Sequence, residues 1–299
     1  MMTMEFKSRP WGVVQWQWKN IVYYGVAATV AWALIEPAGL GFLELPVMPV
    51  TIVGAAIGIF ASFRANQAYD RWWEGRKLWG RMINSSRHWS SQVIQYLKPE
   101  DRSVTEALVQ RHVAYVHALR CLLRGQDPYD DADFMRFAED EPGLRQSTNL
   151  THALLDRQLA ALVPLNDAGR LDSHRLESMD QTLMDFLNIQ GGCERINGTP
   201  LPRGVGFIVQ LLIRTFSIML PFAMVHELGW VAIPLNMLVC LAFALISEAG
   251  RVLEDPFNLF YNGLPLHALS IKIERNLRER LGHTDLPPGV QVQPPGVLM

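Results

Sequence analysis

Two long blocks of the chain are almost free of charge, and this constrains the fold more than any other feature. Residues 20–63 and 204–247 each contain only two charged side chains, in a chain with 27 Lys and Arg and 29 Asp and Glu. The four are Glu36, Glu44, Arg214 and Glu227. Such blocks suit a hydrocarbon environment, whereas the rest has the charge density of a soluble protein. The pattern excludes a disordered chain and a simple soluble enzyme.

Each block has room for two membrane-crossing helices joined by a short turn. The apolar runs are residues 20–35 and 45–63 in the first block, and 204–225 and 228–247 in the second, and of these only 204–225 contains a charge, Arg214. A helix rises about 1.5 Å per residue, so residues 45–63 would cover roughly 28 Å, close to the thickness of the hydrocarbon layer. The sequence predicts four transmembrane helices in two hairpins.

Lys and Arg predict the orientation. They are absent from both hairpin turns and present on the flanks, at Lys7, Arg9, Lys19, Arg64, Arg71, Arg203 and Arg251. By the positive-inside rule, both turns lie outside and both termini lie in the cytoplasm. The predicted parts are a cytoplasmic segment (1–19), helices 1 and 2 (20–63), a cytoplasmic helical domain (64–203), helices 3 and 4 (204–247), a C-terminal cytoplasmic helix (248–282) and a flexible tail (283–299).

The polar parts have helical patterns and no strand alternation. No proline interrupts residues 64–97, so the second span is predicted to continue as one very long helix. A helix over 99–123 follows, with Ser103 and Glu106 spaced as a capping box. Further helices are expected over 130–139, 148–163, 170–190 and 266–281. The predicted fold class is therefore all-α.

Two parallel stripes run along the second span. Gly54, Gly58 and Ser62 are small residues at spacing four, an arrangement that lets helices approach closely. One position along, Ala55, Ile59 and Phe63 form an apolar stripe turned by about 100°. This second stripe either lines a narrow pore that gates by dewetting or is ordinary packing and lipid-facing surface. Spacing alone favours ordinary surface.

Arg214 lies midway along the third predicted span and is expected to be a buried charge. A charge at the centre of a bilayer costs at least ~2.5 kcal/mol, so it should face protein or water and find a partner. Either a residue of an ion pathway or a structural ion pair fits this position. The sequence does not separate the two.

Enzyme, cofactor and nucleic-acid functions lack support. His112 and His117 are five apart, unlike the i, i+4 histidines of a zinc helix, and no P-loop or G-x-S-x-G occurs. Acidic residues from Asp127 to Asp133 fit a solvated loop better than a calcium loop. The spacing of Cys121, Cys193 and Cys240 fits neither disulfides nor a metal site. A net charge of -2 argues against nucleic acid. We expect a non-enzyme without cofactor or metal.

Four spans cannot readily enclose an ion path, whereas a ring of copies can, each contributing one lining helix. A homo-oligomer in contact with membrane lipids is the main expectation. The alternative from another class is a membrane-anchored scaffold or enzyme whose helical domain binds a partner.

Three motifs resemble those of bacterial bestrophin homologues, a family of ion channels. The first is IFASFRANQAYDRWWEGRKLWG at 59–80. The second joins GCERI at 192–196 with TPLP at 199–202, and the third joins EDPF at 254–257 with LPL at 264–266. Their order and their places beside the predicted spans also match the family.

The resemblance implies a homopentamer around one axial pore, in the bacterial inner membrane. It places Ala55, Ile59 and Phe63 in a hydrophobic neck, which reverses the preference drawn from spacing. A second constriction, the cytoplasmic aperture, falls at Glu177, and a shift of one residue would put Leu176 there instead. Five Glu177 side chains would form a negative ring that favours cations.

The same resemblance bears on ion type and gating. The stretch after the fourth span carries only Glu254 and Asp255 as adjacent acids, too few oxygens for a good calcium site, so calcium activation is not expected. The expected function is a channel for small monovalent ions that prefers cations, as bacterial relatives of the family do. A chloride or anion channel of the bestrophin type is the alternative.

Overall fold

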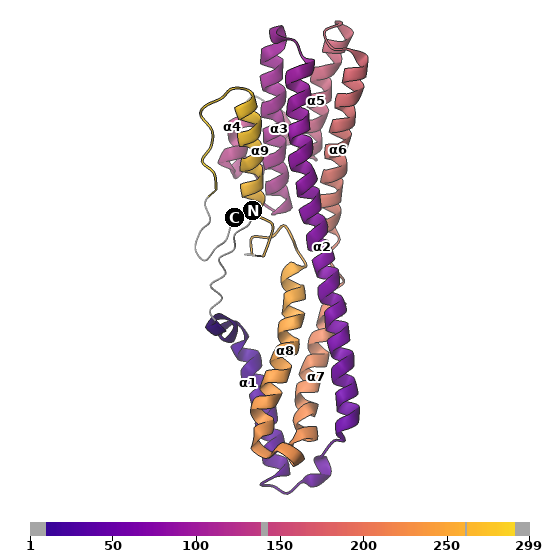
Figure 1. Cartoon of the computed structure of the whole chain (residues 1–299), viewed down its shortest axis with the longest axis vertical. Coiled ribbons are helices and arrows are strands. Elements are labelled where there is room, and N and C mark those ends of the chain that lie inside the picture. The colour runs from indigo at the N-terminus through magenta and orange to yellow at the C-terminus, as the bar shows by residue number, and fades with distance from the viewer. Residues whose placement is uncertain (1–9, 139–142, 261, 291–299) are drawn as a thin grey trace. The chain divides into compact units, whose positions relative to one another are not determined.

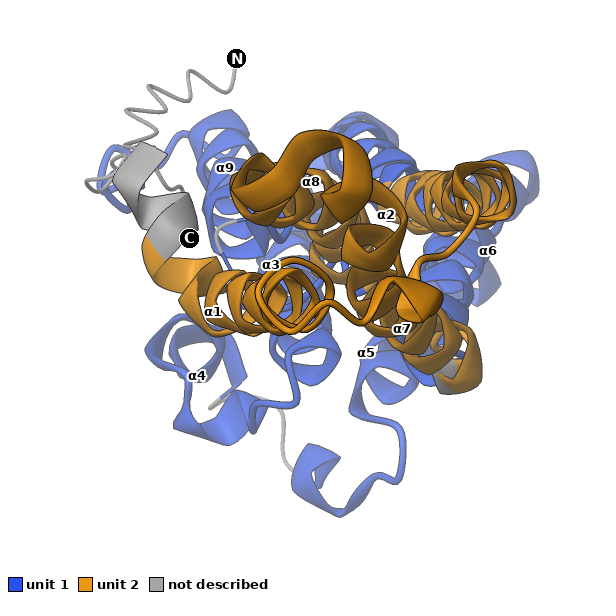
Figure 2. Ribbon diagram, turned by 90° about the horizontal axis from the view of Figure 1, so that it is seen from below, with its two compact units in different colours: residues 1–4, 73–199, 255–299 blue, residues 5–72, 200–254 orange. Residues whose placement is uncertain are grey.

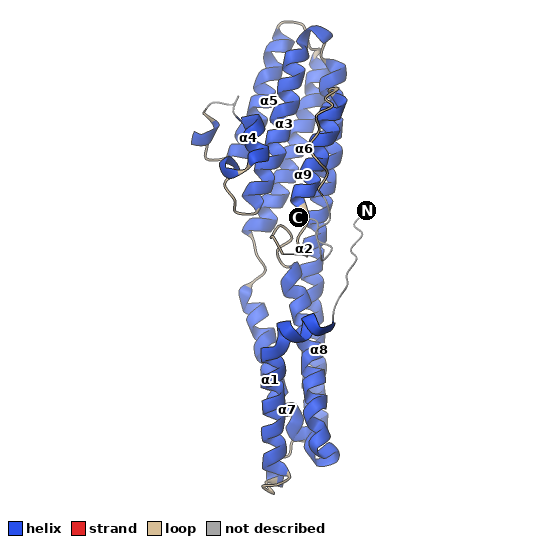
Figure 3. Cartoon of the chain, turned by 90° about the vertical axis from the view of Figure 1, so that its left-hand side faces the viewer, coloured by secondary structure: helices blue, strands red, loops and turns tan. Residues whose placement is uncertain are grey.

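The computed structural model describes residues 10–138, 143–260 and 262–290, and within these ranges every regular element is a helix (Figure 1, Figure 3). The predicted all-α fold is confirmed. Two parts of the predicted domain organisation, residues 1–9 of the N-terminal segment and 291–299 of the tail, lie outside the described residues.

The chain divides into two compact units (Figure 2). The apolar unit comprises Glu5–Trp72 and Pro200–Glu254, and the polar unit is built mainly from Trp73–Thr199 and from the chain after Asp255. Each unit is assembled from segments far apart in the sequence. The boundary falls at Trp72 and Trp73, further along the chain than the change of polarity at Arg64.

Four helices form the apolar unit: α1 (Pro10–Ile35), the first part of α2 (Val47–Tyr96), α7 (Arg203–Leu228) and α8 (Ala232–Leu253). Helices α1, α7 and α8 pack against one another, and α7 and α8 are joined by the short 3-10 turn Gly229–Val231. Buried apolar side chains from all four helices form the core, among them Tyr24, Ile57, Ile213, Phe216 and Ala244.

By length and composition, two helical stretches could cross a membrane, Val47–Tyr96 and Gly204–Leu253. The second stretch contains both α7 and α8. Helix α1 ends at Ile35, where the first span is predicted to end, but it begins at Pro10 rather than near residue 20. The four-span topology therefore stays a prediction.

Helix α2 is 50 residues long. This confirms that the helix of the second span continues unbroken beyond Arg64. It ends at Tyr96, just before Pro99, because a proline disfavours helical geometry in the residue before it.

The polar unit contains the rest of α2 with α3 (Arg102–Leu123), α4 (Ala132–Ala138), α5 (Leu150–Asp167), α6 (Ser173–Gly198) and α9 (Leu266–Arg280). Helix α3 is central, since α4, α5 and α9 all pack on it. The largest fully buried side chains of this unit include Trp79, Trp89, Tyr115, Phe134 and Phe186. The unit thus has its own aromatic core.

The capping box predicted at Ser103 and Glu106 is wrong. Helix α3 begins at Arg102, so Ser103 lies inside the helix and Asp101 occupies the capping position. The cause is the 3-10 turn Pro99–Asp101, which brings the chain into helical geometry before Ser103. Glu106 pairs with Arg102 at 3.1 Å instead.

The first part of the predicted tail lies against α9. Residues 283–290 have no regular structure, but Pro287 is buried and its carbonyl accepts a hydrogen bond from Arg275 at 2.7 Å.

Candidate functional site

The apolar stripe of α2 is uncovered in the single chain. Ala55 is exposed, and the exposed fractions of Ile59 and Phe63 are 60% and 63%. The opposite side of the same helix is buried, with Ile57 and Ala61 in the core. Helix α2 therefore packs by one face and presents three apolar side chains on another.

The small-residue stripe lies against aromatic rings of the same chain. A Cβ added at Gly54 would lie 2.8 Å from Cζ of Phe216 on α7, and one at Gly58 would lie 3.3 Å from Phe243 on α8. The two rings contact each other edge to face, with centroids 5.6 Å apart. Ser62 is exposed. Only glycine allows these rings to approach the backbone of α2 so closely.

Both stripes border one open groove of about 700 Å³ within the apolar unit. Its lining comes from α2, α7 and α8 and consists of Thr51, Gly54, Ala55, Gly58, Ile59, Ser62, Phe63, Asn66, Phe216, Leu220, Val239 and Phe243. No side chain in this set carries a charge at neutral pH. Its polar side chains are the neutral Thr51, Ser62 and Asn66, and the remaining lining residues are apolar.

Arg64, the residue after Phe63, was not singled out by the sequence analysis. It is 9% exposed, and its guanidinium lies 3.3 Å from the carboxylate of Glu254 and 3.5 Å from the hydroxyl of Ser247. Gly206 on α7 leaves the space, since a Cβ there would lie 2.7 Å from Nη2 of Arg64. The signal available in the sequence was that Arg64 lies at the end of an apolar run and Glu254 begins the EDPF motif a few residues after another such run.

The prediction that Arg214 is buried is not met within the single chain. Its side chain is exposed, because α7 buries Ile213, Phe216 and Ser217 and turns Arg214 toward the outside. That Arg214 faces protein or water and finds a partner in the assembled protein stays a prediction.

Glu177 lies on α6 in the polar unit, one turn after the helix begins. Its side chain is exposed, and that of Leu176 is half-buried. The backbone at this end of α6 is fixed by Asp172, whose carboxylate accepts hydrogen bonds from the amides of His174 and Arg175. Glu177 is thus free to project from the unit.

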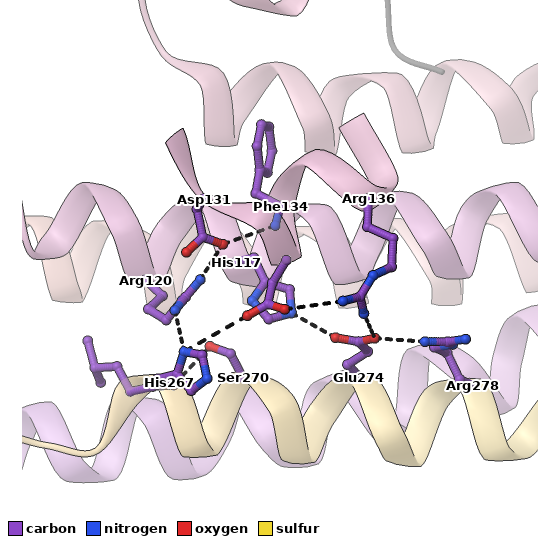
Figure 4. Close-up of polar contacts among 11 residues, drawn as sticks. His117, Arg120, Asp131, Phe134, Arg136, His267, Ser270, Glu274 and Arg278 are labelled. Carbon is purple, nitrogen blue, oxygen red and sulfur yellow. Dashed lines mark hydrogen bonds and ion pairs between the residues drawn. The ribbon is translucent and has the colours of Figure 1, made fainter. Parts of the chain in front are cut away.

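A buried charged cluster in the polar unit also escaped the sequence analysis (Figure 4). His117 on α3 and Glu274 on α9 are both fully buried, with Nε2 of His117 3.1 Å from Oε2 of Glu274. Arg136 and Arg278 contact the other oxygen of this carboxylate at 3.1 and 3.0 Å. Burial would raise the pKa of Glu274, but the hydrogen bonds from His117 and Arg278 lower it below its usual value.

Part of the acidic run after α3 joins the same cluster: Asp131 and Asp133 are half-buried, whereas Asp127 and Asp130 are exposed, as expected of a solvated loop. Asp131 accepts hydrogen bonds at Oδ1 from Arg120 at 2.6 Å and from the amide of Phe134 at 3.0 Å. Burial would raise the pKa of Asp131, but Arg120 and this amide outweigh it and lower the pKa. The acidic residues can be seen in the sequence, but their pairing with Arg120 cannot.

The two histidines of α3 have separate surroundings. Nε2 of His112 lies 2.8 Å from the hydroxyl of Ser86, and burial lowers the pKa of His112 to about 3. The three cysteines are free and buried. Burial raises the pKa of Cys121 to about 11 and that of Cys193 to about 12, so these thiols are unreactive near neutral pH.

Known proteins match nearly the whole length of this chain. Residues 11–279 match the family model described as bacterial/fungal bestrophin protein. A voltage-dependent anion channel-forming protein of Ralstonia nicotianae is 31% identical over 82% of this chain and 80% of its own length. The voltage-dependent anion channel-forming protein YneE of Escherichia coli K12 is also 31% identical, with the same two coverages.

Solved structures agree with the sequence comparison. A crystal structure of a bacterial bestrophin homologue from Klebsiella pneumoniae has a TM-score of 0.82 and 30% identity, covering 90% of this chain and 99% of that one. Family model, relatives and fold therefore agree over both units. The chain belongs to the bacterial and fungal bestrophin family of membrane channel proteins.

Proposed function

We propose that copies of this chain assemble into a ring and form an ion channel whose neck is lined by α2. The observation that carries this proposal is the exposed stripe of Ala55, Ile59 and Phe63 beside an open groove with no charged lining residue. Four spans of one chain cannot readily enclose an ion path, whereas a ring places one such stripe from each copy around an axis.

The groove also supports assembly. It is open, mostly apolar and bordered by Gly54 and Gly58, where aromatic rings approach α2 closely. Exposed aromatic and aliphatic side chains at the edge, such as Ile59 and Phe63, can pack on a neighbouring copy. Five copies, four spans, cytoplasmic termini and the inner membrane complete the proposed arrangement.

For ion type, we propose anion conduction. The two curated relatives described above are named as voltage-dependent anion channel-forming proteins. An apolar neck imposes a dehydration barrier and no fixed charge, so the stripe itself does not exclude anions. This departs from the cation preference expected from sequence.

Cation preference remains the second candidate, because one observation favours it. Glu177 is exposed on α6, and a ring of five carboxylates would attract cations. A cation channel and an anion channel differ in reversal potential, which can be measured on the whole assembly.

The test is the reversal potential of the purified protein in a planar bilayer under a KCl gradient. Anion conduction predicts reversal toward the chloride equilibrium potential, unchanged by Glu177→Gln. The matched control is Asp180→Asn, which removes an exposed carboxylate from the same helix. Reversal on the potassium side that weakens only in Glu177→Gln would establish the cation candidate. A protein that carries no current at any voltage would overturn the channel proposal and favour a membrane-anchored scaffold.

A further inference from the structure

His117 has a buried ring nitrogen without a hydrogen-bond partner. The residue is fully buried in the polar unit, and its Nδ1 is among the buried polar atoms that no donor or acceptor in the described chain reaches. An unpartnered polar atom in the interior costs about 1–3 kcal/mol, so such an atom calls for an explanation.

The other nitrogen of the ring fixes how Nδ1 is presented. Nε2 lies 3.1 Å from Oε2 of Glu274, a carboxylate held in turn by Arg136 and Arg278. When Nε2–H donates to this carboxylate, Nδ1 carries a lone pair. A carboxylate behind a histidine in this way is the usual outer partner of a metal-binding imidazole, since it orients the ring and raises its basicity.

Two carboxylates complete the surroundings of this histidine. Single ligand atoms from His117, Asp131 and Asp133 all lie within 4.8 Å of one another. Ligand atoms that share a Zn²⁺ at about 2.0–2.2 Å lie about 3–4.4 Å apart, so small side-chain rotations bring this set to bonding geometry. Figure 4 shows His117 between the segment before α4 that carries Asp131 and helix α9, which carries Glu274.

Arginine side chains contact one oxygen of each of the two aspartate carboxylates, so the second oxygen of each can bind a metal ion. Arg120 contacts Oδ1 of Asp131 at 2.6 Å, and Arg136 contacts Oδ1 of Asp133 at 3.5 Å. Each carboxylate has a second oxygen, and Oδ2 of Asp133 lies 3.9 Å from Nδ1 of His267. Arg120 also donates to that Nδ1 at 2.6 Å, so His267 borders the set without offering this nitrogen.

We propose that His117, Asp131 and Asp133 form a site for one divalent transition-metal ion per chain. One imidazole and two carboxylates suit Zn²⁺ better than Ca²⁺, which takes six to eight oxygens. Solvent can supply the fourth ligand, because Asp131 and Asp133 are 23% and 18% exposed. The ion would tie the short helix α4 and the turn before it to α3.

The experiment measures Zn²⁺ binding to the untagged full-length protein in detergent, after removal of metal with a chelator. Equilibrium dialysis with elemental analysis gives the stoichiometry, and Co²⁺ in place of Zn²⁺ gives an absorption spectrum that reports the ligand geometry. The site predicts one Zn²⁺ per chain and a tetrahedral Co²⁺ spectrum. Bound Zn²⁺ should also raise the unfolding temperature, because it binds only the folded chain.

Asp133→Asn is the main variant, since Asp133 lies at the edge of the cluster and its loss leaves the pairing of Arg120 with Asp131 in place. Zn²⁺ affinity should fall at least tenfold and the tetrahedral Co²⁺ spectrum should disappear. The control is Asp130→Asn, which removes an exposed carboxylate from the same turn and should leave both unchanged. His117→Gln, if it folds, should behave like Asp133→Asn.

Two results would overturn the site. One is the absence of stoichiometric Zn²⁺ binding by the wild-type chain. The other is binding with equal affinity in Asp133→Asn and Asp130→Asn, which would place the metal elsewhere. Neither result depends on whether the protein conducts ions.

Discussion

Arg64 is a buried charge at the end of the proposed neck-lining segment. It is 9% exposed and is held by Glu254 and Ser247, which come from the end of α8 and the residues after it. Its neighbour Phe63 is 63% exposed, so one helical step separates a fixed charge from an apolar surface. Arg64 therefore anchors the residue that would form the last apolar ring.

Glu254→Gln tests this anchor. The variant leaves a buried guanidinium with a neutral acceptor, so we expect the protein to lose about 1–3 kcal/mol of unfolding free energy. Thermal unfolding in detergent measures this loss of stability. The control is Glu248→Gln. Glu248 pairs with Arg251, whose side chain is 49% exposed, so this ion pair should contribute less than about 1 kcal/mol to the unfolding free energy. Equal losses in both variants would contradict a special role for the Arg64 pair.

His112 makes the stability of the polar unit depend on pH. Its pKa is lowered to about 3 in the folded chain, whereas the unfolded chain binds the proton near pH 6.5. The unfolding free energy should therefore fall as the pH drops from about 6.5 toward 3, by about 1.4 kcal/mol per unit from this residue.

Unfolding midpoints measured between pH 7 and pH 5 check the expectation. His112→Gln should flatten the pH dependence, and His88→Gln, at an exposed position of α2, should keep it. If His112→Gln does not fold, NMR titration of the wild-type imidazole serves instead. An imidazole that titrates near 6.5 in the folded protein would contradict the account.

At the level of elements, α8 approaches α2 through a glycine. A Cβ added at Gly250 would lie 3.2 Å from the backbone Cα of Ala65, and backbone cannot move aside as a side chain can. This contact lies one residue after Arg64 and places α8 where Ser247 reaches the guanidinium. The small stripe of Gly54 and Gly58 controls the distance to aromatic side chains, whereas Gly250 controls the distance between helices.

Gly250→Val should separate the two helices and lower the unfolding free energy by about 1–3 kcal/mol. Gly191→Val is the matched control, since it adds the same side chain inside α6 at a position with nothing within 4 Å of the new Cβ. The control should change stability by less than about 0.5 kcal/mol. A Gly250 variant as stable as the control would show that α2 and α8 can part without cost.

Helix order and extent could be predicted from local signals. The missing prolines after Arg64 predicted the long α2, and the apolar runs located α7 and α8 to within a few residues. Partner choice could not be predicted in this way. Arg64 meets Glu254 and His117 meets Glu274 across more than a hundred residues of chain, and no local pattern specifies which buried acid meets which base. The surroundings of Arg214 could not be predicted for a related reason, since the side of α7 that packs inward depends on neighbours from other helices.

For the whole molecule, the boundary between units does not follow the change in polarity. The charge-rich stretch that follows the second apolar run begins at Arg64. Arg64 itself is buried in the apolar unit, which extends to Trp72. The chain returns to this unit at Pro200 and leaves it after Glu254, where two of the family motifs lie. These motifs therefore mark the points at which the chain passes between the units, with the Arg64–Glu254 pair at one of them.

In the proposed channel, the exposed stripe on α2 is the barrier to ion flow. Single-channel conductance of Ile59→Ala and Phe63→Ala, recorded in planar bilayers beside the wild type, tests it most directly. Both variants shorten an apolar side chain in the proposed neck and should conduct severalfold more current, because a wider and less apolar neck is easier to wet. Phe60→Ala is the control, since Phe60 is partly exposed on α2 but does not line the groove. Raised conductance in the two stripe variants alone is the predicted result, and wild-type conductance in both would contradict the account.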